Sequence, residues 1–263
     1  MRLFWEFTVR SFQRHLTYRA AAVAGLVTNF FFGILRVSVL LAILGEQESI
    51  EGYGRAELFT YMALTQAIIT YLSLFGWYDL MNAVHSGEIA TDLLKPMGFV
   101  SFWLARDVGR AAVALLLRGV VIMALYSLFF DMVHPTSVAQ VTAVAVSLIL
   151  ALLISFGFRF LLNLSAFWSP NARGIGRFGF TISWFFSGFL MPLAFFPAWV
   201  QQIAYLTPFP YALNVIVEIY TGQLTGPALW QTLCIQLLWG LLLFTLAHVT
   251  LRTAVKRLVI LGG

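Results

Sequence analysis

Basic residues alternate along this chain with hydrophobic stretches that are each long enough to cross a bilayer. Thirteen of the sixteen Lys and Arg residues fall in the two tails and two of the connecting segments. A helix needs about 20 apolar residues to cross a membrane. Apolar residues make up 60% of the 263 residues and charged ones 10%, which is too little polar surface for a water-soluble domain. We therefore predict an all-α integral membrane protein.

Six transmembrane helices are predicted from the hydropathy of successive segments. After an N-terminal segment at 1–19, we expect one membrane domain over 20–263. Its spans are expected at about 20–44, 58–77, 111–130, 138–158, 178–196 and 229–250.

The basic connectors define the expected orientation. The three connectors of the opposite set, at 45–57, 131–137 and 197–228, contain Arg55 as their single Lys or Arg. Because basic flanks resist translocation, we place the basic set in the cytoplasm, with both chain termini inside. Topology and anionic lipid headgroups account for the excess positive charge, so no nucleic-acid partner is expected. The basic set comprises Arg2, Arg10, Arg14 and Arg19, then Lys95, Arg106 and Arg110, then Arg159, Arg173 and Arg177, and finally Arg252, Lys256 and Arg257.

The N-terminal segment 1–19 mixes aromatic, aliphatic and basic residues. This pattern predicts an amphipathic helix in the cytoplasmic interface. A simple basic anchor for the first span is the alternative. The residues concerned are Leu3, Phe4, Phe7, Arg2, Arg10 and Arg14.

Motifs for common chemistries are missing from the sequence. It has no Gly-rich phosphate loop, no zinc motif of two His around a Glu, and no nucleophile elbow. The four His residues are scattered and Cys234 is the one cysteine, so we expect no metal site. We expect no catalytic residues and no cofactor in this chain.

The connector after the second span contains the densest polar pattern. Ser86-Gly87 bends the chain, the composition of 88–95 favours a helix, and Pro96 ends it. We predict a short cytoplasmic helix with Ile89, Leu93 and Leu94 on one side and Glu88, Asp92 and Lys95 on another. Such a helix suits either a docking element or an interfacial helix packed on lipid.

The run Gly87-Glu88-Ile89 followed by Leu93-Leu94-Lys95-Pro96 resembles the permease subunits of type-2 ATP-binding-cassette exporters. In that family the loop after span two carries a coupling helix that docks on a separate ATPase subunit. The resemblance implies two such ATPases holding ATP and Mg, and a second permease subunit, either identical or a paralogue. It assigns ATPase coupling to Gly87, Glu88, Ile89, Asp92, Leu93, Leu94 and Lys95.

The connector after the fifth span carries a second resemblance, to the family's re-entrant hairpin helices. Its motifs are Ser187-Gly188, Met191-Pro192, Phe196-Pro197-Ala198-Trp199 and Leu206-Thr207-Pro208-Phe209-Pro210-Tyr211. Residues 197–228 are mostly apolar yet interrupted by prolines, which favours short helices packed against protein at membrane depth. An ordinary surface loop is the alternative. Glu218 is the single charged residue there.

Several polar residues inside predicted spans are candidates for a substrate path or a dimer seam. Asn29, Gly33 and Arg36 lie on one helix face. The alternative for Arg36 is an ion pair with Glu57 or Glu218. Gln66, Ser187 and Glu218 complete the candidate set.

We therefore expect an exporter permease in the bacterial plasma membrane, moving an amphiphilic drug, glycolipid or natural product outward by alternating access. An ATPase-independent channel, an ion-coupled transporter, and a subunit that only anchors partners remain as alternatives. An ion-coupled transporter is expected to carry acidic residues at mid-span, and none is placed there by the predicted boundaries.

Overall fold

The computed structural model describes residues 1–17, 19–74 and 76–257, and the regular elements in those ranges are helical. Residue 18 of the predicted N-terminal segment, residue 75 of the predicted second span, and residues 258–263 lie outside the described residues. The elements are α1 Arg2–Leu16, α2 Arg19–Leu44, α3 Arg55–Tyr71, α4 Asp79–Ser86, α5 Ile89–Leu93, α6 Phe99–Ala114, the π-helical turn η1 Leu115–Gly119, α7 Val120–Phe129, α8 Val138–Leu164, η2 Ser165–Phe167, α9 Ala172–Phe186, η3 Leu193–Phe195, α10 Ala198–Tyr205, α11 Phe209–Ala212, α12 Asn214–Tyr220 and α13 Gly226–Val255.

Four helical stretches among the described residues are long and apolar enough to cross a bilayer. They are Val23–Leu44, Phe99–Phe129, Val138–Phe167 and Gly226–Val255. The second of these begins twelve residues before the span expected at 111–130. Arg106 and Arg110 therefore lie on α6, and Arg159 lies on α8, although the sequence placed all three in connectors. The Arg106 guanidinium stacks on Trp103 of the same helix, Arg110 bonds Asp107 and a carbonyl of α3, and Arg159 pairs with Asp107.

Two other predicted spans contain shorter helices that stop early. Helix α3 ends at Tyr71, inside the span expected at 58–77, and α9 ends at Phe186, inside the span expected at 178–196. The described residues 72–74 and 76–78 that follow α3 are not helical, and residues 187–197 that follow α9 contain only the short helix η3. We call these two segments the α3 break, residues 72–74 and 76–78, and the α9 break, residues 187–197.

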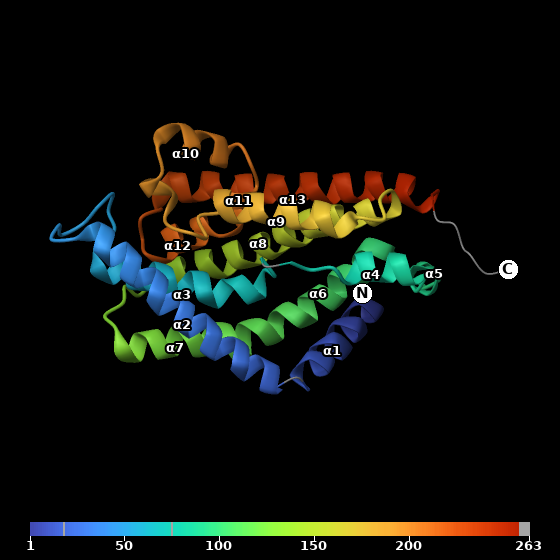
Figure 1. Cartoon of the computed structure of the whole chain (residues 1–263), viewed down its shortest axis with the longest axis horizontal. Helices are drawn as coiled ribbons and strands as arrows, with labels where there is room; N and C mark the ends of the chain where they lie inside the picture. The colour runs from blue at the N-terminus through green and yellow to red at the C-terminus, as the bar shows by residue number, and fades with distance from the viewer. Residues whose placement is uncertain (18, 75, 258–263) are drawn as a thin grey trace.

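The helices form an elongated bundle with two distinct ends (Figure 1). Helices α4 and α5 lie at one end, together with α1, and we call it the α5 end. Helices α10, α11 and α12 lie toward the other, the α10 end. Helices α8 and α13 run beside each other along the bundle, and α2 packs on α3.

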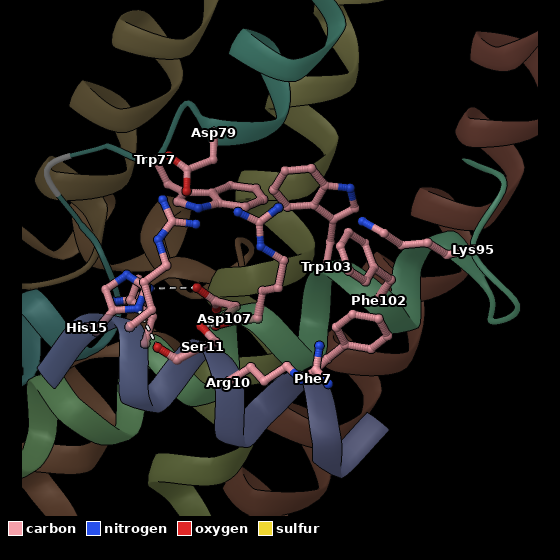
Figure 2. Close-up of a pocket in the computed structure, with 13 residues that line it drawn as sticks. Phe7, Arg10, Ser11, His15, Trp77, Asp79, Lys95, Phe102, Trp103 and Asp107 are labelled. Carbon is pink, nitrogen blue, oxygen red and sulfur yellow. Dashed lines mark hydrogen bonds and ion pairs between the residues drawn. The ribbon is translucent and has the colours of Figure 1, made fainter. Parts of the chain in front are cut away.

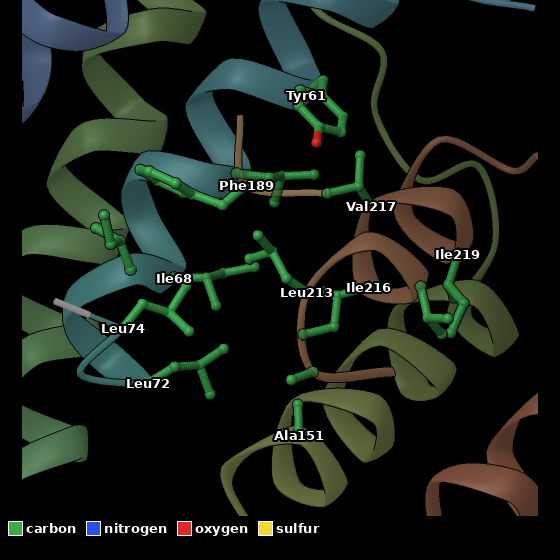
Figure 3. Packing of buried hydrophobic residues seen from close by; sticks show 14 of the residues in the cluster. Tyr61, Ile68, Leu72, Leu74, Ala151, Phe189, Leu213, Ile216, Val217 and Ile219 are labelled. Carbon is green, nitrogen blue, oxygen red and sulfur yellow. The ribbon is translucent and has the colours of Figure 1, made fainter. Parts of the chain in front are cut away.

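The main hydrophobic core lies where α3 and α8 meet the α11–α12 segment. Figure 3 shows Ile68 and Leu72 facing Leu213 and Ile216, with Ala151 of α8 close by. Leu213 and Ile216 are fully buried, so residues 209–220 are part of the core and not a loop on the surface. A second cluster at the α5 end joins Leu80, Ile89, Trp103, Phe156 and Phe160.

Helix α1 packs along the first turns of α6. The Ser11 hydroxyl donates a hydrogen bond of 2.6 Å to the Arg106 carbonyl, and Thr8 is buried beside it. The other side of α1 exposes Leu3, Trp5 and Val9. The helix therefore has one side fixed to the bundle, and its exposed side carries these apolar residues together with Glu6 and Arg10.

Candidate functional site

Helices α4 and α5 meet at a bend, and we call the pair the elbow. Its root, formed by Ile89 and Lys95, is packed against the rest of the protein. Gly87 ends α4 with φ of 79°, a left-handed conformation that glycine adopts without steric cost. Ile89 follows and is only 1% exposed, packed into the second hydrophobic cluster. Lys95 pairs with Asp92, and its ammonium lies 3.7 Å from the centre of the Phe102 ring on α6.

We call the exposed part of the elbow, formed by Glu88, Thr91 and Leu94, its tip. The apolar residues exposed and buried there are not divided as the sequence predicted. Glu88 and Thr91 are exposed and Leu94 is 86% exposed, whereas Leu93 is partly buried against the second cluster. The three apolar residues expected on one side are therefore divided between the protein interior and the surface. The reason is that Leu94, at the end of α5, keeps a helical backbone and therefore lies well around the helix axis from Ile89.

Side chains of neighbouring helices bond the backbone carbonyls at the end of α3 and at the start of the α3 break. Arg110 donates hydrogen bonds of 2.7 and 2.8 Å to the carbonyls of Thr70 and Tyr71. Ser155 donates one of 2.7 Å to the Leu72 carbonyl. Buried carbonyls without a partner cost several kcal/mol each, so these bonds are what allows the helix to stop there.

A buried ion cluster around Asp107, which Figure 2 labels, orients those donors. The Asp107 carboxylate receives Arg110 at 2.8 Å and Arg159 at 2.7 and 3.1 Å. Arg159 is 1% exposed, and its Nε donates to the carbonyl and hydroxyl of Ser155. Helices α6 and α8 are thus joined by a carboxylate shared between two guanidinium groups.

The rest of the α3 break is bonded by α8 and α9. Asn163 donates to the Trp77 carbonyl at 2.8 Å, and its amide oxygen accepts from the Met81 N–H at 3.0 Å. The Trp184 indole donates to the Leu74 carbonyl. The break is therefore tied to three helices at once.

The candidate residues of α2 face the interior of this chain. Asn29 lies 3.5 Å from the Thr70 hydroxyl. A Cβ at Gly33 would overlap the Tyr126 hydroxyl and press on the buried Gln66, so glycine permits the close packing of α2 on α3 and α7. Gln66 in turn contacts the Met62 sulfur at 3.9 Å.

Arg36 binds backbone, not a carboxylate. Its guanidinium donates to the carbonyls of Phe189 and Leu190 in the α9 break, the second at 2.9 Å, and lies 4.2 Å from the centre of the Phe189 ring. The two acidic partners considered for it are bonded elsewhere: Glu57 accepts from the Gly54 N–H, and Glu218 from Asn214 and Tyr205.

Ser187 and Glu218 meet through Asn214 at the α10 end. The Ser187 carbonyl accepts from the Asn214 N–H at 3.1 Å, and Glu218 accepts from the Asn214 amide at 2.7 Å and the Tyr205 hydroxyl at 3.2 Å. Burial raises the pKa of Glu218 above its ordinary value, although these two hydrogen bonds oppose the shift. The α9 break is thus bonded to the short helices that follow it.

A family model for the ABC-2 family transporter protein matches residues 29–262 of this chain. The chain belongs to this family. It is a permease subunit of an ABC-2 transporter and a multi-pass membrane protein, as the sequence motifs predicted. A comparison with curated proteins gives no match.

The sequence did not single out the residues that hold the α3 break of this permease. Asp107, Arg110 and Arg159 were placed outside the spans, and Asn163 was not singled out. One signal was available: Asp107 and Arg110 are three residues apart, the spacing of an ion pair on one helix face. Their connection to Arg159 depends on how α6 packs against α8, which spacing does not reveal. No group of His, Cys, Asp and Glu suited to a metal ion occurs in the part of the chain that the structure describes.

Proposed function

We propose that this permease is the membrane half of an exporter that moves an amphiphilic substrate outward and draws energy from two separate ATPase subunits. Those subunits would bind ATP and Mg. The four long helical stretches would be four of six spans, and α3 and α9, each with its break, the other two. The α5 end and both chain termini would face the cytoplasm of a bacterial cell, and a second permease subunit, identical or paralogous, would complete the path.

The α4–α5 elbow is the observation that carries this proposal. Its tip presents Glu88, Thr91 and Leu94, while Ile89 and Lys95 fix its root to α6 and the second cluster. An exposed apolar residue beside charge on a rigid base suits docking into a cleft of another subunit. Force on the tip would pass through α4 to the α3 break, because Asn163 bonds the backbone of both.

The α10 end would form the outer gate in this mechanism. The α9 break, α10 and α12 are joined through Asn214, so they would move as one piece when the helices tilt. Cytoplasmic closure of the ATPases would thereby open a path toward the outside. An ion-coupled mechanism has less support, because Asp107, the buried acid of α6, is already paired with two guanidinium groups.

Docking is tested by substitution at the tip. Leu94→Asp should weaken co-purification of the ATPase by about tenfold or more and reduce transport equally, since it places an unpaired carboxylate in the interface. Glu88→Ala should act in the same direction with a smaller effect. Leu206→Asp is the matched control, because Leu206 is 78% exposed at the α10 end. Undiminished ATPase binding by Leu94→Asp, or full transport by the permease alone in liposomes, would falsify the proposal.

A further inference from the structure

A cavity of about 300 Å³ lies between α1 and α6 at the α5 end. Figure 2 shows its lining, with α1 on one side and the aromatic rings of α6 on the other. Six of the side chains that line it are arginine, lysine or histidine. They are Arg10, Arg14, His15, Lys95, Arg106 and Arg110.

Much of that charge is not neutralised within the permease. The lining includes two carboxylates, and Asp107 is occupied by Arg110 and Arg159. Lys95 is paired with Asp92. The guanidinium groups of Arg10, Arg14 and Arg106 make no ion pair among the described residues. The cavity therefore attracts an anion.

A buried donor in the wall points to the same kind of ligand. The Trp103 indole nitrogen is buried and has no hydrogen-bond partner among the described residues. Leaving such a buried donor unpaired is unfavourable. Figure 2 shows the nitrogen edge of this ring on the side of the Lys95 ammonium, while the Arg106 guanidinium lies 4.3 Å from the ring centre. An acceptor oxygen between these groups would satisfy the indole and meet two cations.

The position of the cavity identifies the source of the anion. It opens beside the first turns of Phe99–Phe129, a stretch long enough to cross the bilayer, and beneath α1, whose Leu3, Trp5 and Val9 are exposed. Amphipathic helices of this kind lie at the level of the lipid headgroups. We propose that the cavity binds the phosphate of an anionic phospholipid and so clamps α1 onto α6. This inference rests on the chain being a membrane protein. It does not depend on the exporter function proposed above.

The test measures lipid binding by the full-length permease. Native mass spectrometry in detergent would compare phosphatidylglycerol with phosphatidylcholine of the same acyl chains, and inorganic phosphate alone. We expect phosphatidylglycerol to bind more tightly, and Arg10→Gln, Arg14→Gln and Arg106→Gln each to weaken it about fivefold, the effect of about 1 kcal/mol per basic residue. Arg10 and Arg14 are exposed, so these two variants leave the fold intact.

Two further variants separate a site from general surface charge. Arg252→Gln removes an exposed charge from the last turn of α13, outside the cavity, and should leave phosphatidylglycerol binding unchanged. Trp103→Phe keeps an aromatic ring but removes the N–H, and should weaken phosphatidylglycerol more than phosphatidylcholine. Equal affinity for the two lipids, an equal loss in Arg252→Gln, or displacement of the lipid by inorganic phosphate would overturn the proposal.

Discussion

The two breaks in this permease are built with different chemistry. The α3 break is bonded by Arg110, Ser155, Asn163 and Trp184, which come from α6, α8 and α9. The α9 break receives one cation, from α2, and most of its other bonds are with the segments directly after it. Gln201 of α10 donates to the carbonyls of Ala194 and Phe196. The Asn214 N–H of α12 donates to the Ser187 carbonyl, and the Asn214 amide oxygen accepts from the Leu193 N–H.

This difference indicates different mechanical roles. A break tied to three separate helices cannot shift unless those helices shift, so the α3 break transmits movement. A break bonded mainly to its own continuation can move together with it, so the α9 break and the short helices after it can act as one lid. The ion cluster of Asp107, Arg110 and Arg159 is the feature that makes the first break rigid.

The largest expected effect comes from removing Arg159. Arg159→Met leaves Asp107 with one partner and Ser155 without its donor, and should lower the free energy of unfolding by about 3–5 kcal/mol. The double variant Asp107→Leu with Arg159→Met should lose clearly less than the sum of the two single losses, because no buried charge is then left unpaired on that side. Thermal unfolding in detergent measures the stability of the two single variants and the double variant. Losses that simply add would show that the two side chains are not coupled.

A smaller effect is expected at the α9 break. Arg36→Met removes the donor to the carbonyls of Phe189 and Leu190 and should lower stability by about 1–3 kcal/mol. The loss is smaller than for Arg159 because no buried carboxylate loses its partner. Val39→Ala, on the exposed side of α2, is the matched control and should change stability by less than about 0.5 kcal/mol. A loss as large as that of Arg159→Met would contradict the contrast between the breaks.

Sequence reasoning reached the class, the family and the position of the elbow, because these follow from hydropathy and short motifs. Helix α5 forms where Ser86-Gly87 and Pro96 predicted a short helix, and the family match agrees with the resemblance. Hydropathy also explains the main error. It counts each charge separately, so Asp107 and Arg110 moved the predicted start of the third span to 111, although paired charges can be buried together.

Other features depend on packing partners that the sequence does not show. The pattern of 88–95 predicted that Ile89, Leu93 and Leu94 form one apolar side. It did not indicate which of them packs against the protein. The structure buries Ile89 and exposes Leu94. Arg36 is a similar case: the sequence suggested acidic partners for a buried cation, and the broken end of α9 supplies carbonyl oxygens instead.

The smallest expected effect concerns Glu218, the acidic residue in the short helices after the α9 break. Because burial raises the pKa of Glu218 above 4.5, the folded permease holds this proton at pH values where the unfolded chain has released it. Stability from this group is therefore complete below about pH 4.5 and is lost as the pH rises through the higher folded value. Glu218→Gln keeps a side chain that can accept from Asn214 and Tyr205 but removes the titration. We expect the variant to lose less stability than the wild type as the pH rises above about 4.5.

Melting temperatures across that pH range, in one detergent and at constant ionic strength, measure this difference. Glu46→Gln is the matched control, because Glu46 is an exposed acid in the loop after α2 and should leave the wild-type pH dependence in place. Arg159→Met should shift the whole curve downward without changing the part that Glu218 contributes, since the two breaks use separate groups. A pH dependence that persists in Glu218→Gln would mean that the lid is not where this titration occurs, and the two breaks would then have to be regarded as electrostatically connected.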